Sequence, residues 1–263
     1  TMSFGSSNTV GSVSDDVRNV AQGDIDGDGY IDLVTVDGNK NIKVWQNDGT
    51  PFSGTWPSQS VGSTDDDLKT LEFADFDNDG DLDIVSGARE DTTGSNDYEL
   101  MVWQNDGTPF SDTWSSNDVG AVDWTIWTVR VGDIDNDGDI DILSGGSHGN
   151  NAEVVVWQND GTPFSGTWSG NEFGTDTDYV KTVWDVDLGD LDNDGDLDIV
   201  AGCGAPSTQT YELKLFQNDG TPFSGAWSLT DIGASSDHIK SVKLGDFDID
   251  GYLDIASGTG SAE

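Results

Sequence analysis

Residues 133–141 have the sequence Asp-Ile-Asp-Asn-Asp-Gly-Asp-Ile-Asp, with a carboxylate at every second position. Related segments occur at residues 24–32, 75–83, 190–198 and 246–254, and all five have Asp at positions one, three, five and nine and Gly at position six. Their first positions are separated by 51, 58, 57 and 56 residues. A repeat that runs through the chain predicts one continuous architecture, so we expect residues 1–263 to form a single domain.

Each Asp-rich segment lies between two stretches with the pattern of β-strands. Alternating apolar and polar residues precede it, as at residues 186–188, and an apolar run that ends in small residues follows it, as at residues 198–204. In four repeats a third stretch follows, as in VWQNDGTPF at residues 156–164, where Asn, Gly and Pro indicate a hairpin before a polar fourth strand. Four short strands per repeat predict an all-β fold, a β-propeller of four-stranded antiparallel blades with five repeats visible.

The two ends of the sequence predict an incomplete last blade. Residues 1–12 resemble residues 50–63, which contain a fourth strand, whereas two strands but no VWQNDG segment surround the fifth Asp-rich loop. We expect the N-terminal strand to join the C-terminal strands and close this blade. The unfilled strand position would then leave an edge for self-association. The alternative is that the chain is a fragment of a larger ring.

The spacing of the acidic residues predicts calcium binding. Ca²⁺ prefers six to eight oxygen ligands, which carboxylates and main-chain carbonyls can supply. We expect side chains at positions one, three, five and nine and the carbonyl at position seven to be ligands, so about five Ca²⁺ are predicted. An EF-hand is excluded because the twelfth residues are Thr, Ser or Ala and the flanks are strands. The predicted ligands are Asp24, Asp26, Asp28, Tyr30 and Asp32; Asp75, Asp77, Asp79, Asp81 and Asp83; Asp133, Asp135, Asp137, Asp139 and Asp141; Asp190, Asp192, Asp194, Asp196 and Asp198; and Asp246, Asp248, Asp250, Tyr252 and Asp254.

The charge of the chain limits its partners. There are 51 acidic and 10 basic residues, which give a net charge of −41. So acidic a protein is not expected to bind nucleic acid or an anionic membrane directly. The sequence also has no apolar run of the roughly 18 residues that a membrane helix requires, so no membrane insertion is expected.

With its five Asp-rich loops and their flanking strands, essentially the whole chain resembles the FG-GAP or VCBS repeat propellers. That family includes the integrin α-subunit head and certain fungal lectins. The resemblance implies a calcium-loaded propeller with the loop between the first and second strands of each blade. It also implies an extracellular or cell-surface protein concerned with adhesion or carbohydrate binding. The chain departs from the common seven blades by showing five loops.

One register of the first strands differs between repeats. The sixth residue before each loop is, in order, Arg18, Lys69, Trp127, Trp184 and Lys240. Because first strands of propellers line the central channel, Trp127 and Trp184, with Trp124 nearby, could stack on sugar rings. The alternative is that these Trp residues fill space between blades.

The favoured function is an adhesion or carbohydrate-binding module of a microbial surface or secreted protein, with a glycan or a surface protein as its partner. The rival is a structural subunit of a surface layer or filament assembled through the incomplete blade. No catalytic residue and no enzyme activity are expected, because no nucleophile signature accompanies either of the two histidines. A calcium-dependent polysaccharide lyase is a less favoured alternative.

Overall fold

The computed structural model describes residues 7–89, 99–120, 125–148, 151–173, 182–204, 211–225 and 227–260. In this part of the chain 18 β-strands form five antiparallel sheets, and there is no helix. Accordingly, none of these residues belongs to a helix that could span a membrane. The prediction of an all-β fold built from four-stranded antiparallel sheets is confirmed.

The sheets follow one another along the sequence, and we call them blades 1 to 5. Strands that are consecutive in sequence are neighbours within each blade. Blade 1 comprises β1 (Val17–Gly23), β2 (Asp32–Asp37), β3 (Asn41–Trp45) and β4 (Ser58–Ser63). Blade 2 comprises β5 (Asp67–Ala74), β6 (Asp83–Arg89), β7 (Leu100–Gln104) and β8 (Ser115–Gly120). Blade 3 comprises β9 (Thr125–Gly132), β10 (Asp141–His148), β11 (Asn151–Gln158) and β12 (Ser169–Phe173). Blade 4 comprises β13 (Thr182–Gly189), β14 (Asp198–Gly204), β15 (Tyr211–Gln217) and β16 (Ser228–Ser235), and blade 5 comprises β17 (His238–Gly245) and β18 (Asp254–Gly260).

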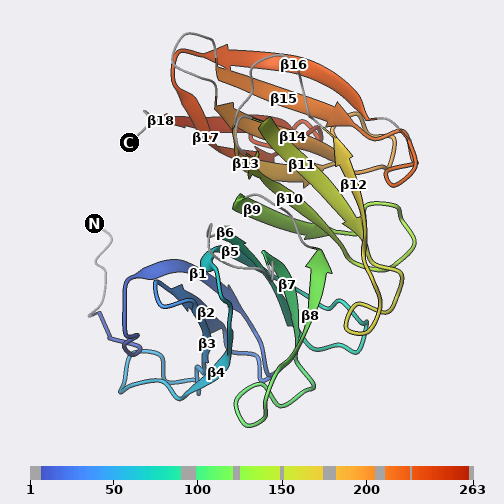
Figure 1. Cartoon of the computed structure of the whole chain (residues 1–263). Coiled ribbons are helices and arrows are strands. Elements are labelled where there is room, and N and C mark those ends of the chain that lie inside the picture. The colour runs from blue at the N-terminus through green and yellow to red at the C-terminus, as the bar shows by residue number, and fades with distance from the viewer. Residues whose placement is uncertain are drawn as a thin grey trace.

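The blades are arranged along an arc with their first strands toward its inner side (Figure 1). The first strands β1, β5, β9, β13 and β17 contact one another in sequence order. The arc is open between blade 1 and blade 5, and no sheet joins these two blades within the described residues. The arrangement is therefore propeller-like, without a closed ring in the described part of the chain.

The hydrophobic core lies between adjacent blades. The first strands of blades 2 to 5 each pack two apolar residues, three positions apart, against the preceding blade. These residues are at most 3% exposed in blades 2 to 5, as with Leu68 and Leu71 in β5. Their equivalents in β1, Val17 and Val20, are 50% and 52% exposed. Blade 1 therefore presents an apolar face that the other blades bury.

A β-bulge in every first strand explains this three-residue spacing. In β5 the pairing register with β6 shifts between Leu68 and Thr70, so Lys69 is the extra residue. Because side chains alternate in a regular strand, residues three apart share a face only where such an extra residue is inserted. The extra residues of the five blades are Arg18, Lys69, Trp127, Trp184 and Lys240.

No closing strand is found in the described part of the N-terminal segment, and residues 1–6 of the predicted strand lie outside the described residues. The described residues 7–16 form no strand, and they lie on blade 1 rather than beside β18. The carbonyl of Val10 accepts a hydrogen bond from the Trp56 amide (2.9 Å), and Gly11 lies against the Trp45 ring. Gly62 of β4 has the same relation to Trp103 of blade 2. This segment thus occupies the fourth-strand place of a preceding blade, but the described residues include no third strand for it to pair with.

Candidate metal centres

Each Asp-rich segment forms the turn between the first and second strands of its blade, and we number these loops 1 to 5. In loop 3, for example, β9 ends at Gly132 and β10 begins at Asp141. The backbone has positive φ at positions four and six of all five loops, 58–70° and 90–98° respectively. Gly at position six adopts this conformation at no steric cost, and Asn, which fills position four in loops 2 to 4, tolerates it. The two left-handed residues curl each loop inward.

The curl brings carboxylates together. At least three aspartates of each loop place oxygen atoms within 4.8 Å of one another. The carboxylate at position one is fixed by the amide of the position-six Gly, as in the 3.1 Å bond from Gly138 to Asp133 Oδ2. The same bond occurs in the other four loops. The grouped residues are Asp24, Asp26 and Asp32; Asp75, Asp77 and Asp83; Asp133, Asp135 and Asp141; Asp190, Asp192 and Asp194; and Asp246, Asp248 and Asp250.

A glutamine at the end of the third strand orients the carboxylate at position three. In blade 3, Gln158 Nε2 donates to Asp135 Oδ2 at 2.9 Å. Blades 1, 2 and 4 contain the same bond, at 2.7, 2.8 and 3.2 Å. This bond leaves the other oxygen of the carboxylate available inside the loop. The sequence analysis missed this role, although the WQND or FQND segment recurs in four repeats, because it was interpreted only as a hairpin signal.

The carboxylate at position nine is buried and held by two main-chain amides. Asp83 accepts hydrogen bonds from Phe76, in its own loop, and from Asn105, after the third strand, at 3.0 and 2.8 Å. Burial raises the pKa of Asp83 to about 8, although these two amides oppose the shift. For the same reason the pKa values of Asp32 and Asp141 rise to about 6 and 7. A cation beside these carboxylates would favour their charged form.

Two of the aspartates at position seven connect neighbouring blades. Asn78, at position four of loop 2, donates to Asp139 Oδ1 of loop 3 at 2.9 Å. Asn136 of loop 3 donates in the same way to Asp196 Oδ1 of loop 4 at 3.1 Å. Asp81, like Asp139 and Asp196, lies against the Gly of the loop after its third strand. A metal contact from position seven would therefore come from the main-chain carbonyl, and this role of Tyr30 and its equivalents stays a prediction.

Position five lies at the exposed side of the loops. Its carboxylate accepts a hydrogen bond from the position-seven amide in every loop, at 2.8–3.0 Å. The residues at this position are Asp28, Asp79, Asp137, Asp194 and Asp250.

The residues of these loops fit a hard divalent cation. All ligand atoms that the loops offer are oxygens, which Ca²⁺ and Mg²⁺ prefer. Oδ1 atoms of Asp24, Asp77 and Asp135 are buried and have no hydrogen-bond partner among the described residues. A buried carboxylate oxygen without a donor is costly, and a bound cation would remove that cost. The Asp clusters could therefore hold metal ions.

Comparison with known proteins agrees with this geometry. A family model described as FG-GAP-like repeat matches residues 3–86 and 135–201, which is more than half of the chain. The chain belongs to the FG-GAP-like repeat family. No curated protein sequence matches it. Among solved structures it is similar to a chain in "Crystal structure of BBS1N in complex with ARL6DN, soaked with lead", with a TM-score of 0.52 and 16% identity. The match covers 94% of this chain and 63% of the other, and at this identity it supports the fold alone.

Loop 5 is the most open of the FG-GAP-like loops. Asp254 accepts the amide of Phe247 at 3.0 Å, as its equivalents do, but it has no third-strand amide on its second oxygen in the described residues. Asp254 is exposed, whereas Asp32, Asp83 and Asp141 are fully buried. Ile249, at position four, is 89% exposed and has a φ of 64°, which is strained for a β-branched residue.

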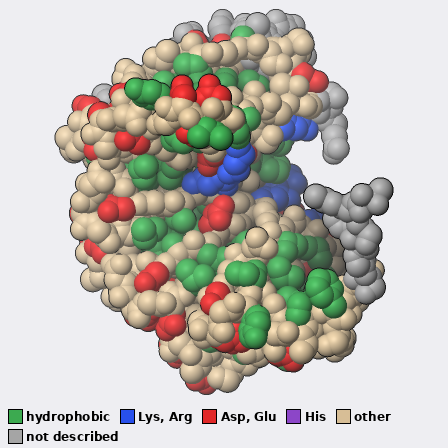
Figure 2. Space-filling model, turned by 180° about the vertical axis from the view of Figure 1, so that it is seen from behind, with side chains coloured by type: hydrophobic (Ala, Val, Ile, Leu, Met, Phe, Trp, Pro, Cys, Tyr) green, Lys and Arg blue, Asp and Glu red, His purple; other side chains and the backbone are tan. Residues whose placement is uncertain are grey.

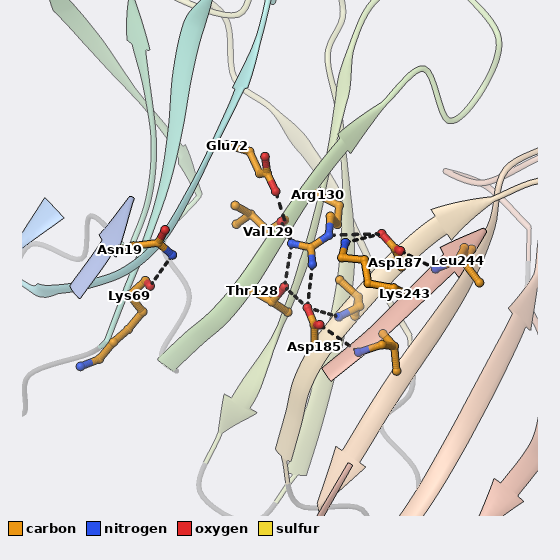
Figure 3. Close-up of polar contacts among 12 residues, drawn as sticks. Asn19, Lys69, Glu72, Thr128, Val129, Arg130, Asp185, Asp187, Lys243 and Leu244 are labelled. Carbon is orange, nitrogen blue, oxygen red and sulfur yellow. Dashed lines mark hydrogen bonds and ion pairs between the residues drawn. The ribbon is translucent and has the colours of Figure 1, made fainter. Parts of the chain in front are cut away.

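A second group of charged residues lies on the inner strands of the FG-GAP-like repeats, away from the loops. Arg130 of β9 forms ion pairs with Glu72 (3.4 Å), Asp185 (2.8 Å) and Asp187 (3.3 Å) (Figure 3). Asp185 and Asp187 of β13 also accept hydrogen bonds from the amides of Val242 and Leu244 in β17, at 3.0 and 2.8 Å. Each charged group of this Arg130 cluster has an ion-pair partner, and the cluster ties blades 2 to 5 together.

The two tryptophans predicted at the channel lie together. The ring centroids of Trp127 and Trp184 are 5.1 Å apart and their planes are tilted by 38°. Lys69 Nζ lies 6.0 Å from the Trp127 ring centroid, and Lys240 Nζ lies 5.1 Å from that of Trp184. Trp124, the third predicted ligand-binding residue, lies outside the described residues.

Proposed function

We propose that this chain is an extracellular, calcium-stabilised, propeller-like module of a microbial surface or secreted protein that serves adhesion or carbohydrate binding. Each FG-GAP-like repeat binds about one Ca²⁺, which gives five ions for the chain. The observation that carries the calcium part is the set of converging carboxylates with orphaned buried oxygens at Asp24, Asp77 and Asp135.

Calcium suits these loops better than magnesium. Ca²⁺ accepts six to eight oxygens in flexible geometry, whereas Mg²⁺ requires near-octahedral geometry and retains several waters. Each loop offers up to four carboxylates and one carbonyl, which is a large protein contribution to the coordination. Sites of extracellular modules bind Ca²⁺ with dissociation constants of about 10⁻⁴ to 10⁻³ M, so loops of that affinity would fill outside a cell and remain empty in the cytosol.

The binding role rests on the inner side of the arc. Trp127 and Trp184 form an aromatic pair there, and aromatic side chains with a few polar groups are typical of small-molecule sites. The partner would be a glycan or a glycan-bearing surface protein. The proposal includes no catalytic step and assigns no catalytic residue.

Two measurements test the proposal. Calorimetric titration of the metal-free chain with CaCl₂ should give about five sites, and a glycan array with the calcium-loaded chain should give saccharide signals that disappear in EGTA. The variants D77N and D135N should each remove one calcium site. Titration with no calcium uptake, or an array without any saccharide signal, would contradict the corresponding half of the proposal.

A structural subunit of a surface layer or filament is the second candidate. The observation that favours it is the exposed apolar surface at the two sides of the open arc, where Val17 and Val20 lie on blade 1 and Phe247, Ile249 and Tyr252 lie on blade 5. Within a propeller, neighbouring blades bury such residues, so an exposed apolar patch of this kind indicates a contact with another molecule. Light scattering after size-exclusion chromatography decides between the candidates, because a subunit of this kind should form polymers that V17D or I249D disrupts.

A further inference from the structure

The five bulge residues Arg18, Lys69, Trp127, Trp184 and Lys240, which we call the bulge tier, have a composition unlike that of the rest of the protein. The tier contains three of the ten basic residues in a chain of net charge −41, and no acidic residue. Bulges redirect side chains out of the regular alternation of a strand and are common beside functional sites. Five aligned bulges therefore present a coherent set of non-core side chains.

The middle of the bulge tier is a continuous line of contacts across four blades. Lys69 of β5 lies over Trp127 of β9, Trp127 lies against Trp184 of β13, and Lys240 of β17 lies over Trp184. Figure 3 shows the Lys69 side chain directed away from the Arg130 cluster. The space-filling view shows basic side chains gathered in the hollow of the arc (Figure 2). The middle of the tier is thus a line of cationic and aromatic side chains along the inner strands.

The cations of the bulge tier have fewer ion-pair partners than Arg130, which has three. Lys69 is paired with Asp67. Within the described residues, Arg18 and Lys240 make no ion pair. Lys240 is thus a cation without an ion pair beside an aromatic pair, and this arrangement points to a negatively charged ligand.

We infer that the bulge tier binds an anionic saccharide, a pyranose that carries a carboxylate or a sulfate group. The Trp127 and Trp184 rings would provide the apolar contact with the sugar ring. Lys69 and Lys240 lie over the two rings, and Lys240, which has no ion pair among the described residues, would bind an acidic group of the sugar. A neutral sugar would leave Lys240 without a charged partner, so the tier selects for charge. This inference deepens the proposed carbohydrate-binding function and rests on it.

The charge of the rest of the molecule limits where such a ligand can bind. Elsewhere the surface carries most of the 51 carboxylates, which repel an anion. Calcium in the loops offers the one competing route, because an acidic sugar can bind to protein-held calcium directly. Substitution of Lys240 separates the two routes, since it would leave calcium-bridged binding unchanged.

The test measures binding of three oligosaccharides of equal length to the calcium-loaded chain by calorimetry: an oligogalacturonate, a sulfated oligosaccharide and a neutral cello-oligosaccharide. K240Q should weaken binding of the anionic ligands about tenfold, as expected for loss of a charged hydrogen bond. K43Q is the matched control, because Lys43 Nζ lies 5.1 Å from the Trp45 ring centroid in blade 1, the same distance as in the Lys240 pair but outside the tier. It should bind as the unmodified chain does. W184F tests the aromatic contact.

The outcomes distinguish this inference from the function on which it rests. Anionic ligands that bind more tightly than the neutral one, with loss in K240Q but not in K43Q, support the inference. Equal binding of K240Q and K43Q, or neutral sugars bound as tightly as acidic ones, would overturn it and leave carbohydrate binding in place. No saccharide binding by the unmodified chain would overturn both. Unchanged melting temperatures of K240Q and K43Q ensure that the comparison concerns folded protein.

Discussion

The asparagine after each third strand provides a direct test of how neighbouring blades are joined. Asn105 Nδ2 donates to the Ile25 carbonyl of loop 1 at 3.0 Å and to the Leu82 carbonyl of its own loop at 3.3 Å. Asn159 and Asn218 bind the preceding and their own loops in the same way. Asn47 of blade 1 donates only within its own blade, to the Ile31 carbonyl at 3.1 Å. We therefore expect N105A to destabilise the fold more than N47A.

The expected difference follows from the one bond that the two sites do not share. Both substitutions remove a bond to a carbonyl of the residue's own loop and a bond from a Gly amide two residues later. N105A also removes the cross-blade bond and leaves the Ile25 carbonyl without that donor in a buried place. A lost hydrogen bond that orphans a buried group costs about 1–3 kcal/mol. N105A should therefore lower the free energy of unfolding by about 1–3 kcal/mol more than N47A.

Urea unfolding in excess calcium, followed by tryptophan fluorescence, measures this difference. With a denaturant slope of about 3 kcal/mol/M, the midpoint of N105A should lie about 0.3–1 M below that of N47A. N159A should behave like N105A, because Asn159 also binds the preceding blade, at 2.8 Å. Equal midpoints for N47A and N105A would refute the argument that these asparagines join the blades.

Three further predictions concern calcium, the glutamine contact and the cysteine. Removal of calcium with EGTA should lower the melting temperature, since each site at a calcium concentration 100 times its dissociation constant adds about 2.7 kcal/mol; unchanged melting would exclude the coupling. Q158A should lower the calcium affinity of loop 3 about 10- to 100-fold in a terbium luminescence titration, whereas Q59A, whose side chain binds the Asp112 carbonyl outside the loops, should not. Burial raises the pKa of Cys203 to about 12, so its thiol should stay unreactive toward a disulfide reagent at pH 8 in calcium and react after unfolding; reaction in the folded protein would show that blade 4 opens.

The sequence was sufficient for the features that depend on local chemistry. The loops were predicted because a left-handed turn that gathers carboxylates needs Gly at position six, and Gly80 and its equivalents have that conformation. The four-strand repeat followed from the alternation of apolar residues on both sides of each loop. Residues 1–12 were likened to a fourth strand, and in the described part of this segment Gly11 lies on Trp45 as Gly62 lies on Trp103.

Features that depend on contacts between repeats could not be predicted in the same way. The bulge in each first strand interrupts the alternation of side chains. The sequence alone therefore did not show that apolar residues three positions apart, such as Leu68 and Leu71, lie on the same face of the strand. Gln158 was not recognised as a partner of Asp135 because 23 residues separate them, and only the folded blade brings them together. The closing strand is not confirmed, because a fourth strand pairs with a third strand, and blade 5 has none among the described residues.

The proposed calcium and saccharide sites lie toward opposite ends of the same inner strands, and this separation determines how calcium can act. Lys240 precedes the first carboxylate of its loop, Asp246, by six residues, which is about 15–20 Å in a bulged strand. A sugar group held by the bulge tier is too far from the loops to share a calcium ion with them. Calcium would therefore influence saccharide binding only by holding the blades at the spacing that places Trp127 against Trp184. Affinity at the tier should follow the folded fraction as calcium is withdrawn, whereas a calcium-bridged ligand would dissociate as soon as the ion leaves, while the chain is still folded.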